Sequence, residues 1–267
     1  MCLIVFAWRP GHDVPLLLAA NRDEFYARPS LPLGHWDDEP GVYAGRDLQA
    51  GGTWLGLGPD GRFAALTNIR DPRQAIGPRS RGELPARYLT STLAPAEFLA
   101  QLAPQASEFS GFNLLLGNNK ELWHYNPRSG APRPLSAGVY GVSNADLDSP
   151  WPKLLRARKG LQQALPAGDD EALFALLADP QRAADSELPE TGVGLEIERL
   201  LSSVFIASPG YGTRASTLVK VYADGSRRIH ERRFGPDGVA LGETCLRFSE
   251  SYYISSNPFS PPCFIHP

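Results

Sequence analysis

The chain opens with two apolar runs, Cys2 to Trp8 and Val14 to Ala20, separated by the turn residues Arg-Pro-Gly-His-Asp at positions 9–13. Neither run alternates apolar with polar residues, which is typical of strands buried on both faces. Flanking turn residues predict that the two strands pair as a hairpin. The first strand of this buried hairpin therefore begins at Cys2.

Three further segment pairs follow the same pattern of two short strands around a turn. They are Thr53 to Gly58 with Phe63 to Asn68, Phe112 to Gly117 with Glu121 to Tyr125, and Thr217 to Tyr222 with Arg227 to Arg233. Other segments space their apolar residues by three and four positions, which predicts helices. These are Gly82 to Leu93, Ala94 to Leu102, Trp151 to Leu165, Asp169 to Asp179 and Gly194 to Ser202.

Strands grouped as hairpins with helices between the groups predict an α+β fold of mostly antiparallel sheets. Two such sheets packed face to face with helices outside form a four-layer αββα sandwich. We expect one domain over residues 1–254. Residues 255–267 contain four prolines in thirteen positions, which predicts an extended or disordered tail.

Composition excludes several classes of partner. The 267 residues are 42% hydrophobic and 21% charged, an ordinary globular composition, and the net charge of −3 offers no electrostatic footprint for nucleic acid. No apolar stretch reaches the roughly 18 residues of a membrane span, and the first apolar run lacks the basic flank of a signal peptide. Three scattered cysteines indicate neither a disulfide framework nor a zinc site, so we expect a cytoplasmic protein.

Cys2, directly behind Met1, is a candidate nucleophile. Removal of Met1 would leave a thiol and a free α-amine on one residue, so the amine, with an ordinary pKa near 8, could relay the proton of the attacking thiol. The alternative is that Cys2 is only the first apolar residue of a buried strand.

The second polar constellation is Asn21-Arg-Asp-Glu24, just past the second apolar run. The predicted hairpin brings it beside Cys2. A guanidinium at Arg22 would lower the pKa of the thiol, and the Asp23 carboxylate would hydrogen-bond to the α-ammonium. The alternative is a solvated charged turn that caps the hairpin.

The chain resembles the NRDE-motif family, also called the transport and Golgi organisation family, whose hallmark is this tetrad. The blocks that carry the resemblance span roughly residues 1–235. They include Met1-Cys2, Ala19-Ala-Asn-Arg-Asp-Glu-Phe25, Gly51-Gly-Thr-Trp-Leu-Gly56, Ala65-Leu-Thr-Asn68, Ser80-Arg-Gly82, Val142-Ser-Asn144, Pro150-Trp-Pro-Lys153 and Tyr211-Gly-Thr-Arg214.

The resemblance implies a fold similar to cysteine-type N-terminal nucleophile hydrolases, with Cys2 as nucleophile and base, Arg22 flanking the thiol and Asp23 holding the amine. It also implies oxyanion donors at Asn144 and Asn68 and a basic group at Arg214 that faces the reacting centre. Each has a structural alternative: an Asx turn at Asn68, a cap at Asn144, and a clamp by Arg214 on a carboxylate such as Asp23 or Glu24.

Two functions follow from the resemblance. One is hydrolysis of an amide, ester or thioester of a small acyl substrate, which needs no cofactor. The other is non-catalytic binding and trafficking of haem or an acyl ligand such as acyl-CoA or a lipid. The five histidines show no metal-ligand spacing, so the sequence assigns no haem ligand, and it does not specify an oligomeric state.

Overall fold

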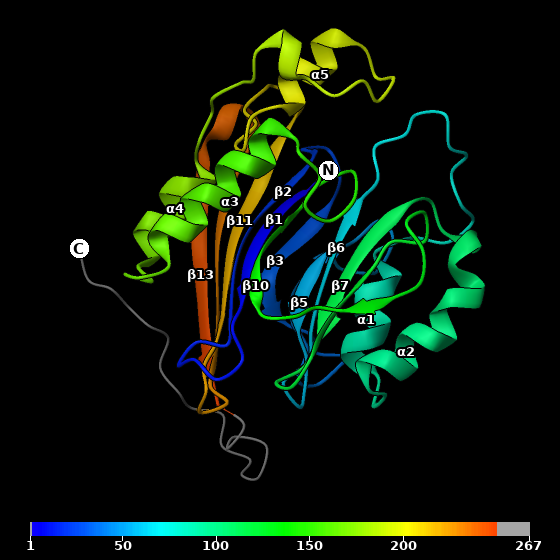
Figure 1. Cartoon of the computed structure of the whole chain (residues 1–267), viewed down its shortest axis with the longest axis vertical. Coiled ribbons are helices and arrows are strands. Elements are labelled where there is room, and N and C mark those ends of the chain that lie inside the picture. Colours follow the sequence, from blue (N-terminus) through cyan, green and yellow to red (C-terminus); the bar gives the residue numbers. More distant parts are fainter. Residues whose placement is uncertain (1, 250–267) are drawn as a thin grey trace.

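Two antiparallel sheets lie face to face in the computed structural model, which describes residues 2–249 (Figure 1). The first sheet has the order β10-β1-β2-β11-β12-β13. Its strands are β1 Cys2–Trp8, β2 Leu16–Phe25, β10 Gly138–Val142, β11 Tyr211–Val221, β12 Arg227–Phe234 and β13 Ala240–Phe248.

The second sheet has the order β3-β4-β5-β6-β7-β8-β9, so each strand pairs with its neighbours in sequence. The strands are β3 Ser30–His35, β4 Tyr43–Asp47, β5 Leu55–Leu57, β6 Phe63–Asn68, β7 Phe112–Gly117, β8 Leu122–Tyr125 and β9 Arg133–Pro134. This meander of local hairpins explains why several of its strands are visible in the sequence.

Helices cover the outer face of each sheet (Figure 1). α1 Glu83–Thr90 and α2 Pro95–Leu102 pack on the second sheet, while α3 Pro152–Ala164 and α4 Asp170–Leu177 pack on the first. A fifth helix, α5 Leu195–Leu201, lies near the start of β1. The predicted α+β fold, an αββα sandwich, is confirmed. Within residues 2–249, no helix combines the length and apolar character that crossing a membrane requires.

The burial of β1 follows the alternation of its side chains. Ile4 and Phe6 point into the core between the two sheets, whereas Leu3 and Val5 pack under α3 and α4. Both faces are thus buried, as the unbroken apolar run predicts. This alternation also decides which way each polar residue near Cys2 points.

The strands extend beyond the predicted limits in two places. β2 continues through the polar tetrad to Phe25, and β11 begins at Tyr211 rather than at Thr217. β2 lies between β1 and β11, so its polar residues have ladder partners on both sides. The sequence also missed β3, β4, β9, β10 and β13, which are short or carry mixed polar residues. The predicted tail at 255–267 lies outside the described residues.

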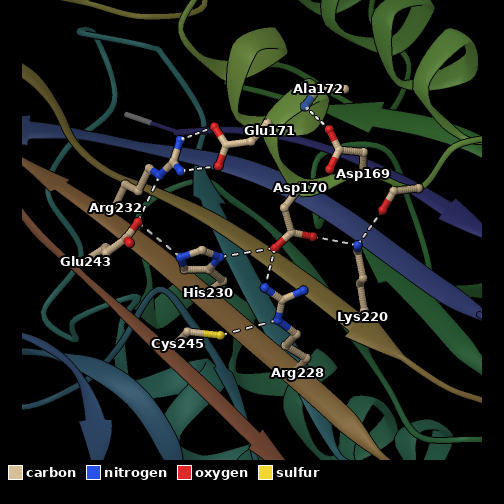
Figure 2. Close-up of polar contacts among 11 residues, drawn as sticks. Asp169, Asp170, Glu171, Ala172, Lys220, Arg228, His230, Arg232, Glu243 and Cys245 are labelled. Carbon is tan, nitrogen blue, oxygen red and sulfur yellow. Dashed lines mark hydrogen bonds and ion pairs between the residues drawn. The ribbon is translucent and has the colours of Figure 1, made fainter. Parts of the chain in front are cut away.

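A polar cluster joins α4 to the outer face of the first sheet (Figure 2). Asp170, in the first turn of α4, accepts from Lys220 Nζ at 2.6 Å, from Arg228 Nη2 at 2.6 Å and from His230 Nδ1 at 3.1 Å. Burial alone would raise the pKa of Asp170, but these hydrogen bonds and charges outweigh it and hold the pKa well below its usual range. One carboxylate therefore connects a helix to two strands.

We expect Asp170→Asn to lower the free energy of unfolding at pH 7 by about 2 kcal/mol, because Lys220 and Arg228 lose a charged partner. The folded-state pKa of Asp170 is depressed, so its contribution is present above about pH 4 and is lost as the pH falls below that value. Urea unfolding at pH 7 and at pH 3 measures both effects. Asp169→Asn is the matched control, because Asn can still cap α4 in place of the Asp169 side chain. Equal effects of the two substitutions would contradict the assignment.

Candidate functional site

A cavity of about 520 Å³ lies where strand ends of the two sheets meet. Its wall includes Cys2 at the start of β1, Arg22 near the end of β2 and Asn68 at the end of β6. The segment at 76–82, between β6 and α1, also lines the cavity. The cavity therefore collects residues that are far apart in the sequence.

Cys2 and Arg22 are direct partners in the antiparallel ladder of β1 and β2. Side chains of paired residues lie on the same face of a sheet, and here that face also carries Ile4 and Ala20 of the core between the sheets. Both residues line the cavity. The prediction that the hairpin brings the tetrad to Cys2 is confirmed, although the tetrad lies within the strand rather than after it.

Asn21 and Asp23 point to the other face, toward the helices. Asn21 is fully buried, donates to the carbonyl oxygens of Leu177 at 2.8 Å and Val204 at 2.9 Å, and accepts from Ser216 Oγ at 2.6 Å. Its side chain ties β2 to the end of α4 and to β11. The tetrad is therefore not a solvated turn, and its first residue has a structural role.

Asp23 is buried and is also one of the residues that line the cavity. Thr213 Oγ1 donates to Asp23 Oδ1 at 2.8 Å, and the same hydroxyl accepts the N–H of Ile206 at 2.9 Å. Tyr211 Oη donates to the Asp23 carbonyl at 3.2 Å. Burial raises the pKa of Asp23, against the opposing charge of Lys153 and the hydrogen bond from Thr213.

The pKa of the Cys2 thiol is raised, contrary to the sequence-based expectation of a lowered value. Burial is the largest cause, because it disfavours the thiolate. Arg22 acts in the expected direction but is too weak to reverse the shift. A thiol in this setting needs a base to remove its proton during attack on a carbonyl.

Lys153 is a site residue that the sequence reasoning missed. Leu154, Ala157 and Leu161 are the other buried residues of α3, so Lys153 lies on the helix stripe that packs against the sheet. Its Nζ is buried without a hydrogen bond to any described residue, and burial lowers its pKa to about 8 although the Asp23 charge opposes the shift. A lysine on the apolar stripe of an amphipathic helix is the signal that could have found it.

Arg70 and Glu198 form a buried ion pair beside Lys153 and Asp23. The Arg70 guanidinium also lies over the ring of Trp151, 4.7 Å from its centroid, and Glu198 accepts the N–H of Thr191 at 3.0 Å. These contacts join the segment after β6 to α5 and to the start of α3. They enclose the side of the site that faces the helices.

The two predicted oxyanion donors differ in position. Asn68 lines the cavity, whereas Asn144 is 1% exposed and stands behind it. Asn144 Nδ2 donates to the Asn68 carbonyl at 2.8 Å, and the N–H of Arg70 donates to the Asn144 carbonyl at 2.8 Å. In this arrangement Asn144 holds the end of β6, and Asn68 is the asparagine that meets the cavity.

Arg214 sits in a β-bulge of β11. Thr213 pairs with Asp23 and Ala215 pairs with Arg22, so Arg214 is the extra residue between them. Its side chain lines the cavity and donates to the carbonyl oxygens of Phe25 at 3.2 Å and of Arg28. Arg214 is thus a cavity-lining residue whose guanidinium is anchored by backbone oxygens rather than by a carboxylate.

Arg81 is a second residue that the sequence reasoning did not assign. It lines the cavity, and its Nη1 donates to the Gly111 carbonyl at 3.1 Å. The adjacent backbone is held because Thr53 N–H donates to the Gly82 carbonyl at 3.0 Å. A Cβ on Gly52 would lie 2.2 Å from that same oxygen, so only glycine permits this approach.

We expect the free energy of unfolding of the wild type, minus that of Lys153→Met, to increase as the pH rises. The folded-state pKa of Lys153 is about 8 and an unfolded lysine titrates near 10.4, so the unfolded chain binds more protons between these values. The relative gain should total about 3 kcal/mol at most across that window. Denaturant unfolding at pH 7.5 and at pH 10.5 measures it.

Lys159→Met, at an exposed position of the same helix, is the matched control and should show no such gain. If the difference between wild type and Lys153→Met stays constant with pH, Lys153 is not held in a setting that disfavours its charge.

Comparisons with known proteins place the chain in a family. The model of the family described as Transport and Golgi organisation 2 matches residues 1–236. The chain is 34% identical to the human Transport and Golgi organization protein 2 homolog, covering 91% of this chain and 97% of the relative, and 28% identical to the Drosophila melanogaster Transport and Golgi organization protein 2, covering 86% and 90%. A solved structure of a Caenorhabditis elegans N-acylethanolamine-hydrolyzing acid amidase ortholog aligns over 81% of this chain and 92% of that one, with 12% identity and a TM-score of 0.46. The chain therefore belongs to the Transport and Golgi organisation 2 family.

Proposed function

We propose that the protein is a cysteine N-terminal nucleophile hydrolase that cleaves an amide, ester or thioester of a small acyl substrate. The observation that carries this proposal is the placement of Cys2, whose side chain lines the cavity beside its register partner Arg22. A buried structural cysteine would not need a cavity of about 520 Å³ in front of it. The proposal requires prior removal of Met1.

The opposite orientation of Asp23 fits a role at the amine rather than at the sulfur. Asp23 follows the register partner of Cys2 and points to the face opposite the thiol. A carboxylate there flanks the amino end of Cys2 and can accept from its α-ammonium. Thr213 fixes the carboxylate from the other side.

In the proposed reaction the Cys2 sulfur attacks the acyl carbon while its proton passes to the free α-amine. The carbonyl oxygen becomes an oxyanion, for which Asn68 is the side-chain donor on the cavity wall and Asn144 is a positioning residue that holds Asn68. The tetrahedral intermediate collapses, the leaving amine, alcohol or thiol takes the proton from the α-ammonium, and a Cys2 thioester forms. Water, deprotonated by the same amine, then releases the acid and regenerates the thiol.

Carriage of a ligand in the same cavity is the second candidate. Burial raises the pKa of the Cys2 thiol, which weakens it as a nucleophile until a free α-amine is available. The relatives are named for transport rather than for catalysis. The ligand would be haem or an acyl compound; among the described cavity-lining residues, Cys2 is the thiol that could contact haem iron, and none is a histidine. Binding of hemin or butyryl-CoA by the wild-type protein, without turnover of butyryl-CoA, would favour this candidate.

We expect Cys2→Ala to lower kcat/KM for butyryl thioesters and 4-nitrophenyl butyrate by about 10³-fold or more, because it removes the attacking atom. Cys2→Ser should retain a small residual rate. Acid-quenched reactions of the wild type should contain a butyryl group on the Cys2 peptide, detected by mass spectrometry, and the intact mass of active protein should lack Met1.

Cys245→Ala is the matched control, because Cys245 is a free cysteine on β13 that does not line the cavity. It should hydrolyse at the wild-type rate. Undiminished hydrolysis by Cys2→Ala, or retention of Met1 on the active protein, would refute the nucleophile assignment.

A further inference from the structure

Among the described residues, four cavity-lining arginines lack a carboxylate partner: Arg22, Arg81, Arg214 and Arg233, the last of which donates from Nη2 to the Leu241 carbonyl at 3.3 Å. The Arg22 side chain makes no hydrogen bond or ion pair to a described residue, the Arg81 side chain donates to one backbone oxygen, and the Arg214 side chain donates to two. These three come from β2, from the segment before α1 and from the bulge of β11. Separate elements therefore direct three guanidiniums at one space, where their charges repel.

Three other arginines of the same wall are neutralised by nearby acids. Arg28 pairs with Asp47 at 2.7 Å and Arg46 pairs with Asp38 at 2.6 Å. Arg79 pairs with Glu83 and Glu108. Acids therefore neutralise only part of the guanidinium charge on this wall.

The acids that line the cavity do not cancel this charge. Asp23 points to the helix face, Asp47 is engaged with Arg28, and Glu231 accepts the N–H of Leu33 at 2.9 Å while burial raises its pKa. Glu24 remains as an acid whose charge acts on Arg81 and Arg214, and it accepts the N–H of Phe25 at 2.8 Å. One carboxylate faces three guanidiniums, so the space in front of Cys2 has a net positive charge.

Burial makes this excess charge unfavourable. The pKa of Arg81 is lowered by burial, and the pKa of Arg214 is lowered by burial and next by the charge of Arg22. An incoming anion would relieve both effects, because a planar guanidinium binds carboxylate and phosphate oxygens through paired N–H donors.

We infer that Arg22, Arg81 and Arg214 form an anion-binding wall, and that the acyl substrate carries an acidic oxygen group, a carboxylate or a phosphate, near the scissile bond. The inference rests on the proposed function in placing that bond at Cys2. Arg81 is then a residue that determines specificity rather than one that takes part in proton transfer.

Charge-selective alkylation of Cys2 tests the wall without any turnover. Iodoacetate and iodoacetamide have nearly the same shape, and in both the thiolate displaces iodide from carbon, but only iodoacetate is an anion. We expect the rate with iodoacetate divided by the rate with iodoacetamide, measured at the Cys2 peptide, to be about tenfold higher than the same ratio for N-acetylcysteine, because the cavity concentrates anions. Arg81→Met should lower the ratio by roughly fivefold, and Arg81→Lys should restore most of it.

Arg182→Met removes an exposed arginine outside the cavity and should leave the ratio unchanged. Thermal unfolding of each variant shows whether loss of the Arg81 contact to Gly111 has disturbed the fold. If the wild-type ratio equals that of N-acetylcysteine and Arg81→Lys behaves as Arg81→Met, the anion-binding wall does not exist.

Two further measurements identify the anion and separate this inference from the proposed function. Protection of Cys2 from iodoacetamide by glutarate indicates a carboxylate, protection by inorganic phosphate indicates a phosphate, and protection by neither contradicts the inference. Glutaryl 4-nitroanilide should be cleaved with a kcat/KM at least about tenfold above that of its methyl ester. Equal cleavage of the pair would overturn the inference while leaving the hydrolase in place. Charge-selective alkylation of Cys2 without cleavage of either compound would support the anion site and refute the proposed hydrolase activity.

Discussion

The antiparallel pairing of β1 with β2 is the constraint on which the site depends. Its register places Arg22 opposite Cys2, and the alternation of side chains then sends those two residues toward the cavity and Asn21 and Asp23 toward the helices. A slip of one residue would exchange the two faces. The apolar residues on either side of the ladder prevent that slip, because each must stay in its own core. Packing of the two cores thus determines which side chains at the strand ends face the cavity.

Burial affects the ionisable groups of the site in a consistent way. It raises the pKa values of Cys2 and Asp23 and lowers that of Lys153, so each group is shifted toward its neutral form. Groups held this way gain their charges when a partner of opposite charge arrives. The site is therefore suited to respond to a ligand, whether that ligand reacts or is only carried.

Much of the fold could be predicted from the sequence, because its hairpins are local and its first strands are buried on both faces. The continuation of β2 through Asn21 to Glu24 could not, since the partners that satisfy Asn21 are the carbonyl oxygens of Leu177 and Val204, which lie 156 and 183 residues away along the chain. Polar residues in a strand look like a turn until those partners are known. The strand β13 was not predicted for another reason, because its residues are largely exposed and their mixed sequence lacks a strand pattern.

The candidate site was predicted in part. The predicted hairpin was enough to place Arg22 and Asp23 near Cys2, and the family resemblance supplied Asn68, Asn144 and Arg214. Which of the two asparagines lines the cavity could not be predicted from the sequence, because their arrangement depends on a hydrogen bond between the segment after β10 and the end of β6. Lys153 and Arg81 are single charged residues whose importance comes only from what surrounds them.

The bulge at Arg214 divides β11 into two stretches, and the side-chain alternation of one is shifted by one residue relative to the other. Downstream of it, Ser216 meets Asn21; upstream, Thr213 meets Asp23, although regular alternation would have turned one of these away. Arg214 and Ala215, consecutive in sequence, both reach the cavity as a result. Geometry therefore constrains the number of residues in this segment more strictly than their identity: loss of one residue would turn the upstream stretch over and separate Thr213 from Asp23, an outcome that replacing the Arg214 side chain cannot produce.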